Sequence, residues 1–277
     1  MSKKKSSSNT QEVQNAAKTL FANIRFMNPD APLKSIVLTS SVPNEGKSVT
    51  SVELARAIAT SGKRTLLVEA DMRRRSLANI LGVRASVGVY SVLTNQASLK
   101  QAIVPTKVSD LYFLDVEPNI PNSADILSSK AYAAMVERLN QSFDYIIFDT
   151  PPVGTFIDAA ILSSLADGTV LVVKPGAVKR EELVRAYDQL RTAGAYVVGT
   201  CATFVEGTGS EYYYAYYTES GKRVKKEDYQ AGPAMPASFN DTSAVEPVAT
   251  TVNHGNASRG GRDGRHGHGS HEAGGRH

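Results

Sequence analysis

Five apolar, β-branched runs alternate with amphipathic helical patterns over the first 205 residues, and this alternation constrains the fold more than any other feature. The runs are SIVLTSS (35–41), RTLLVEA (64–70), YIIFDT (145–150), TVLVVKP (169–175) and AYVVGTCATFV (195–205), with a weaker one, DLYFLDV, at 110–116. Nearly continuous apolar character is typical of strands that are covered on both faces. The pattern predicts an α/β fold, with a mostly parallel sheet flanked by helices on both faces. Ligands of such sheets bind beyond the carboxyl ends of the strands.

The composition of the 277 residues changes along the chain, and we place the domain boundaries at those changes. We expect residues 1–14, which are rich in lysine and serine, to be disordered, and residues 15–209 to form one folded domain. A tyrosine cluster follows at 210–221, and a tail rich in glycine, histidine and arginine occupies 222–277. Because the tail has few large apolar side chains, it cannot offset its ordering entropy, and we expect it to be disordered.

Cysteine and histidine usage excludes several classes of enzyme. Cys201 is the single cysteine and all five histidines lie in the tail, so the folded part has no disulfide, no triad histidine and no thiolate zinc site. No apolar run approaches the roughly 18 residues that span a bilayer, and the first lysines do not precede the apolar core of a secretory signal. We therefore expect a cytosolic chain. The net charge of +4 is mild, and we attribute it to solvated segments rather than to nucleic-acid binding.

A phosphate-binding loop follows the first apolar run. The spacing Ser41-x4-Gly46-Lys47-Ser48 matches the pattern G-x-x-x-x-G-K-[ST], with serine at the first glycine. Gly46 lets backbone amides turn toward phosphate oxygens, Lys47 supplies a positive charge, and the helix that follows adds its positive dipole end. We expect the loop and the first helical residues to bind ATP: Ser41, Val42, Pro43, Asn44, Glu45, Gly46, Lys47, Ser48 and Val49.

Carboxylates stand at the ends of two further runs. Glu69 and Asp71 close LLVEAD at alternate positions, so their side chains point the same way if the strand continues. Asp149 follows four apolar residues in YIIFD. The hydroxyl of Ser48 and such a carboxylate, completed by phosphate oxygens and water, are the usual ligands of Mg²⁺ beside a phosphate loop.

The three motifs SSVPNEGKS, LLVEADMRRR and YIIFDTPPVG resemble, in order and spacing, the Walker A, A′ and B elements of the bacterial tyrosine kinases. The resemblance spans about residues 15–217 and implies a P-loop domain that uses ATP and Mg²⁺ to phosphorylate tyrosine. In this family Lys47 would hold ATP, Ser48, Asp71 and Asp149 would serve the metal, and the residue at position 69 would help to deprotonate the phenol. The catalytic set that the resemblance implies is therefore Lys47, Glu69, Asp71 and Asp149.

The resemblance also explains the segment EYYYAYY near the C-terminus. In these kinases a C-terminal tyrosine cluster is autophosphorylated, which implies phosphorylation of Tyr212, Tyr213, Tyr214, Tyr216 and Tyr217. It further implies a role in capsular and exopolysaccharide synthesis, a membrane-protein activator of the polysaccharide co-polymerase type, a cognate tyrosine phosphatase and self-association through the tyrosine tail. The chain would then lie at the inner face of the cell membrane, held there by its partner.

Several positions depart from the family pattern. Glu69 stands where the family normally has aspartate, and RRRSL replaces the usual Arg-Arg-Pro…His. The oligomerisation motif Glu-x-x-Arg-x-x-Arg aligns with Asn15, Lys18 and Phe21, and Thr203 replaces an asparagine that contacts the base in related ATPases. The chain is either a divergent active kinase or a member that has lost some activity.

Two other functions remain open. The first is an ATPase of the ParA/MinD type, although Val42 stands where those proteins usually carry a second lysine, and the tail cannot form a basic amphipathic helix. The second is an adaptor that binds nucleotide without catalysis. The tyrosines could likewise form an aromatic surface for a partner.

Overall fold

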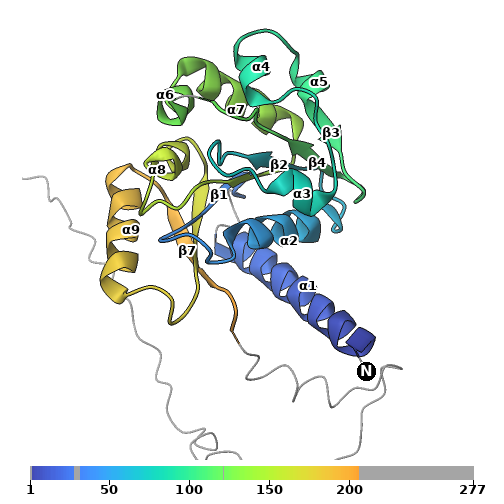
Figure 1. The fold of residues 1–277 in the computed structure, drawn as a ribbon, viewed down its shortest axis with the longest axis vertical. Coiled ribbons are helices and arrows are strands. Elements are labelled where there is room, and N and C mark those ends of the chain that lie inside the picture. The colour runs from blue at the N-terminus through green and yellow to red at the C-terminus, as the bar shows by residue number, and fades with distance from the viewer. Residues whose placement is uncertain (1, 28–31, 121, 206–277) are drawn as a thin grey trace, which may run out of the picture. The chain divides into compact units, whose positions relative to one another are not determined.

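Figure 1 shows the computed structural model of the chain, which describes residues 2–27, 32–120 and 122–205, with side chains from residue 10 onward. The tyrosine cluster and the tail, for which the sequence predicts phosphorylation and disorder, lie outside these described residues.

The described residues form one seven-stranded sheet with the order β3-β4-β2-β5-β1-β6-β7. The strands are β1 (Ser35–Ser40), β2 (Thr65–Glu69), β3 (Ile103–Pro105), β4 (Leu111–Leu114), β5 (Tyr145–Asp149), β6 (Gly168–Val173) and β7 (Val197–Ala202). Strands β3 and β4 pair antiparallel, and all the other pairs are parallel. The predicted α/β fold with a mostly parallel sheet is therefore confirmed, and each of the predicted runs forms a strand. The short antiparallel strand β3 was not predicted.

Helices cover both faces of the sheet (Figure 1), as the sequence predicted. They are α1 (Ser2–Met27), α2 (Lys47–Ala59), α3 (Leu77–Leu81), α4 (Val89–Leu93), α5 (Leu99–Ala102), α6 (Ser123–Leu127), α7 (Lys130–Ser142), α8 (Asp158–Ser163) and α9 (Arg180–Thr192). In the described ranges no helix is both long enough and apolar enough to span a membrane.

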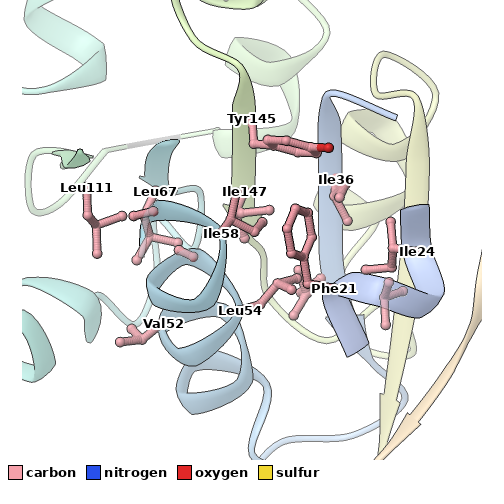
Figure 2. Close-up of a cluster of buried hydrophobic side chains, with 14 of the residues drawn as sticks. Phe21, Ile24, Ile36, Val52, Leu54, Ile58, Leu67, Leu111, Tyr145 and Ile147 are labelled. Carbon is pink, nitrogen blue, oxygen red and sulfur yellow. The ribbon is translucent and has the colours of Figure 1, made fainter. Parts of the chain in front are cut away.

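Alternate residues of each central strand enter different cores, because successive side chains of a strand point to opposite faces. In β1, Ile36 and Leu38 join a cluster with residues of α1, α2 and α3, whereas Val37 joins a second cluster with residues of α4 and α7. Figure 2 shows the first cluster, in which the side chains of helix α2 pack against those of the sheet. Burial on both faces explains why these strands are almost continuously apolar in sequence.

Helix α1 corrects the expectation of disorder for residues 1–14, because the helix already begins at Ser2. Its C-terminal half is anchored in the core, where the ring of Phe21 meets that of Tyr145 edge-on with centroids 5.3 Å apart (Figure 2). Once one part of a helix is fixed, each added residue gains a hydrogen bond at little further nucleation cost. The polar N-terminal residues therefore extend a helix that packing has started, and their composition alone does not reveal it.

Candidate functional site

The order of the strands brings the three predicted motifs together. Strands β2, β5 and β1 are neighbours in the sheet, so their carboxyl ends meet at one edge. Glu69 at the end of β2 pairs in register with Asp149 at the end of β5, and the loop after β1 leads into α2 at Lys47. The candidate nucleotide site therefore lies where parallel α/β sheets usually bind their ligands.

The phosphate loop turns on Gly46, which lies in the left-handed region with φ 84°. A methyl group at this position would lie 3.2 Å from Cε2 of Phe204 and 3.4 Å from Cβ of Thr203, which is closer than most side chains allow. Both the backbone conformation and the limited space therefore favour glycine here. Helix α2 begins directly after this turn, at Lys47.

Glu45 braces the loop from inside. The backbone amides of Ser41 and Val42 donate to its Oε2 at 2.8 and 3.0 Å, and the amide of Lys174 donates to its Oε1 at 3.0 Å. The hydroxyl of Thr203 donates to the backbone carbonyl of Glu45 at 2.7 Å. The side chain of Glu45, which the sequence analysis placed among the nucleotide-binding residues, is buried: its carboxylate ties the loop to the segment after β6, and its backbone carbonyl ties the loop to the segment after β7.

Lys47 and Asp149 form the charged centre of the site. The Lys47 ammonium donates to Asp149 Oδ1 at 2.8 Å and to Ser48 Oγ at 3.3 Å. The hydroxyl of Ser51, one helical turn after Lys47, also donates to Asp149 Oδ1, at 2.9 Å. The other oxygen, Asp149 Oδ2, is buried and accepts no hydrogen bond from any residue that the structure describes. A buried carboxylate oxygen without a donor is expensive, and it fits a ligand that supplies positive charge.

Glu69 is completely buried, and its carboxylate points to backbone amides. The amides of Ser76 and Leu77 donate to Oε2 at 2.8 and 3.0 Å, so Glu69 caps the start of α3. Burial, and then the nearby Asp149 carboxylate, raise the pKa of Glu69 to about 8. The carboxyl group therefore holds a proton near neutral pH when no nucleotide is bound. Its expected role toward the phenol stays a prediction.

Asp71 lies outside the strand, because β2 ends at Glu69. The side chains at positions 69 and 71 were expected to point the same way only if the strand continued, and it does not. The Oδ1 of Asp71 accepts from the amides of Arg73 and Arg74 at 3.1 and 2.8 Å, which makes a tight turn. Burial raises its pKa. With 8% of its surface exposed, against 0% for Glu69, Asp71 is the more accessible of the two carboxylates.

The arginines after Asp71 bind to parts of the chain that the sequence analysis did not connect with the site. The Arg73 guanidinium lies 4.3 Å from the ring centroid of Phe156 and donates to Ser123 Oγ at 2.9 Å. It also pairs with Asp158 at 3.5 Å, and Ser123 donates a hydrogen bond to the same carboxylate. Arg73 thereby joins the turn at Asp71, which follows β2, to α6 and α8. Neither the spacing nor the composition of these segments signals this connection.

The predicted site residues differ in their placement. Lys47, Ser48 and Asp149 are joined by hydrogen bonds, with the Glu69 carboxylate next to Asp149. Val49 points outward with 54% of its surface exposed. No group of three His, Cys, Asp or Glu side chains that could hold a metal by themselves occurs among the described residues. A divalent ion at Ser48 and Asp149 would therefore need oxygens from another source, such as phosphates, which agrees with the P-loop expectation.

Comparison with known proteins identifies relatives of the whole domain. Residues 33–192 match the sequence model of the AAA domain family. The chain is 36% identical to tyrosine-protein kinase YwqD of Bacillus subtilis over 66% of this chain and 77% of that protein. It is 34% identical to tyrosine-protein kinase CpsD of Streptococcus agalactiae over 81% and 96%. The solved BceF tyrosine kinase domain aligns with a TM-score of 0.62 and 34% identity, covering 68% of this chain and 76% of that one.

Proposed function

Because this chain belongs to the family of bacterial tyrosine kinases, we propose that it is a tyrosine autokinase that transfers the γ-phosphoryl group of ATP to its C-terminal tyrosines. The proposed acceptors are Tyr212, Tyr213, Tyr214, Tyr216 and Tyr217. The observation that carries the proposal is the pairing of Lys47 with one oxygen of Asp149, while the other oxygen is buried without a donor among the described residues.

The roles of the residues follow from their positions. Amides of the loop around Gly46 and the ammonium of Lys47 would hold the phosphates of ATP. Ser48, Asp149 and Asp71 would hold Mg²⁺, whose chemical contribution is to neutralise the charge of the phosphates. Ser51 would keep Asp149 in place when Lys47 turns from Asp149 to the phosphates, because Ser51 donates to the same oxygen as Lys47.

The transfer itself requires one proton to move. The phenolic oxygen bonds to the γ-phosphorus, the bond from phosphorus to the bridging oxygen of ADP breaks, and the phenolic proton must be accepted by a base. An unperturbed phenol has a pKa near 10, so it needs such a base at neutral pH. We assign this task to Asp71, the more exposed of the two carboxylates at the end of β2, with Glu69 behind it.

The cellular role in the proposal follows from the family. The kinase would regulate capsular or exopolysaccharide synthesis, stimulated by a membrane protein of the polysaccharide co-polymerase type and reversed by a tyrosine phosphatase. Self-association through the tyrosine tail would bring the acceptor of one copy to the site of another. The partner would hold the chain at the inner face of the membrane.

The test is incubation of the full chain with Mg-ATP, with and without the cytoplasmic segment of a co-polymerase partner, followed by phosphopeptide mapping. We expect phosphotyrosine at Tyr212–Tyr217 in the wild type and none in Lys47→Met. Lys63→Met, at an exposed lysine beyond the C-terminal end of α2, serves as the control for loss of a lysine. The absence of phosphotyrosine under every condition would overturn the proposal, and an ATPase activity stimulated by DNA or lipid would favour a ParA/MinD type.

A nucleotide-binding adaptor is the second candidate, and one observation favours it. The carboxylate of Glu69 is buried and occupied by two amides of α3, a position from which it does not reach solvent. If the chain binds ATP but yields no phosphotyrosine in the same experiment, the adaptor is the better description.

A further inference from the structure

An exposed aromatic ring lies directly beside the phosphate loop. Phe204 follows β7, and 69% of its surface is exposed although it is a large apolar side chain. Its ring lies so close to Gly46 that a methyl group there would be 3.2 Å from Cε2. A second exposed apolar residue, Val49, follows Ser48 in the first turn of α2. The loop that would hold phosphates is thus bordered by two apolar side chains that are each more than half exposed.

The backbone of Phe204 is also unusual. Its φ is 53°, in the left-handed region. A bulky residue is rare in that region, and such strained conformations are often found at functional sites. Phe204 belongs to none of the buried clusters, so packing in a core explains neither its exposure nor its backbone conformation.

One face of the ring already has a partner. The Lys174 ammonium lies over the ring, 4.7 Å from its centroid, in a cation–π contact. Such a contact stabilises the orientation of the ring and makes its surroundings positive. With the residue still 69% exposed, the ring retains open surface for a flat ligand.

Glu45 ties the surroundings of Phe204 to the phosphate loop. Its carboxylate accepts the amide of Lys174, and its backbone carbonyl accepts the hydroxyl of Thr203, the residue before Phe204. The same carboxylate holds the amides of Ser41 and Val42. Glu45 therefore holds both neighbours of the ring next to the phosphate loop, Lys174 through its carboxylate and Thr203 through its backbone carbonyl.

We propose that Phe204, backed by Lys174, is the platform on which the base of the bound nucleotide stacks. This inference rests on the proposed ATP binding and specifies the site that selects a nucleobase. A nucleotide has a flat ring at a fixed distance from its phosphates, which matches an open aromatic ring fixed beside a phosphate loop. Base–aromatic stacking is a substantial and sequence-tolerant source of affinity.

The experiment compares ligands with and without a base. Binding of ADP and of inorganic tripolyphosphate to the full-length chain is measured by calorimetry for the wild type, Phe204→Ala and Tyr196→Ala. Tyr196 is an exposed aromatic residue just before β7 and is the matched control. We expect Phe204→Ala to weaken ADP binding about 10-fold or more, while the affinity for tripolyphosphate changes less than about twofold. We expect Tyr196→Ala to change neither affinity.

A fluorescence measurement adds a readout that affinity alone does not give. The chain contains no tryptophan, so Phe204→Trp introduces a single indole at the platform. We expect ADP to quench this indole, and tripolyphosphate to leave its emission unchanged.

Two results would overturn the inference. The first is wild-type affinity of Phe204→Ala for ADP, which would leave nucleotide binding intact and point to a protein-binding role for Phe204. The second is an equal loss of affinity for both ligands, which would make Phe204 a support of the loop around Gly46. If instead ADP binding depends on Phe204 but no phosphotyrosine forms, the platform stands and the kinase proposal fails.

Discussion

Replacing Glu69 by glutamine tests the electrostatics of the site without nucleotide. Glutamine keeps the length of the side chain and an oxygen that can accept the amides of Ser76 and Leu77, but it removes the titratable proton. The pKa of Glu69 is about 8 in the folded chain, compared with 4.5 for an ordinary glutamate. The folded state therefore binds more protons than the unfolded state between these two pH values.

The sign of the effect follows from that difference. When the folded state binds the extra proton, the free energy of unfolding falls as pH rises, by at most about 1.4 kcal/mol per pH unit for one group. Between pH 6 and pH 8 the wild type should lose about 2 kcal/mol from this source. Glu69→Gln has no such loss, so its stability relative to the wild type should increase by that amount over the same interval.

The measurement is urea unfolding of the nucleotide-free chain at pH 6, 7 and 8 and constant ionic strength, followed by circular dichroism. Glu137→Gln, which removes an exposed carboxylate from α7, is the control and should follow the wild type. If the stability profiles of the wild type and Glu69→Gln run parallel over this range, Glu69 does not carry the proton and the assignment is refuted.

Two further substitutions test the scaffold. A methyl group at Gly154 would lie 2.3 Å from the backbone oxygen of Ser41 and must displace the phosphate loop, so Gly154→Ala should weaken ADP binding in calorimetry. Gly199→Ala is the control and should leave ADP binding unchanged, because a methyl group there meets no atom within 4 Å. Phe21→Ala should lower the free energy of unfolding in urea by about 3–5 kcal/mol because it removes a buried ring, whereas Phe26→Ala, at a residue that is 78% exposed, should change it by less than about 0.5 kcal/mol.

The sequence predicts the parts of the fold whose residues are governed by local rules. The central strands are apolar on both faces, so their runs stand out, and β1 ends within one residue of the expected boundary. The phosphate loop was equally visible, because Gly46, Lys47 and Ser48 follow a strand and open a helix. Strand β3 has only three residues, none of them fully buried, and carries no such signal.

The side-chain directions at the site depended on contacts distant in sequence. Alternation suggested that Glu69 and Asp71 point the same way, but the chain leaves the strand after Glu69, whose carboxylate meets amides seven and eight residues later. Ser51 could have been found, because a residue one helical turn from Lys47 shares its face. The hydrogen bonds of the Glu45 side chain could not have been predicted, since its partner Lys174 is 129 residues away.

The burial of Phe21 determines what kind of stability helix α1 provides. Helix α1 places the ring of Phe21 in the core of its own chain, against Tyr145. A contact made within one chain is independent of protein concentration, whereas a contact between copies weakens on dilution. The helix therefore stabilises the subunit to the same extent at low and at high protein concentration, so copies of this chain could associate and dissociate without unfolding.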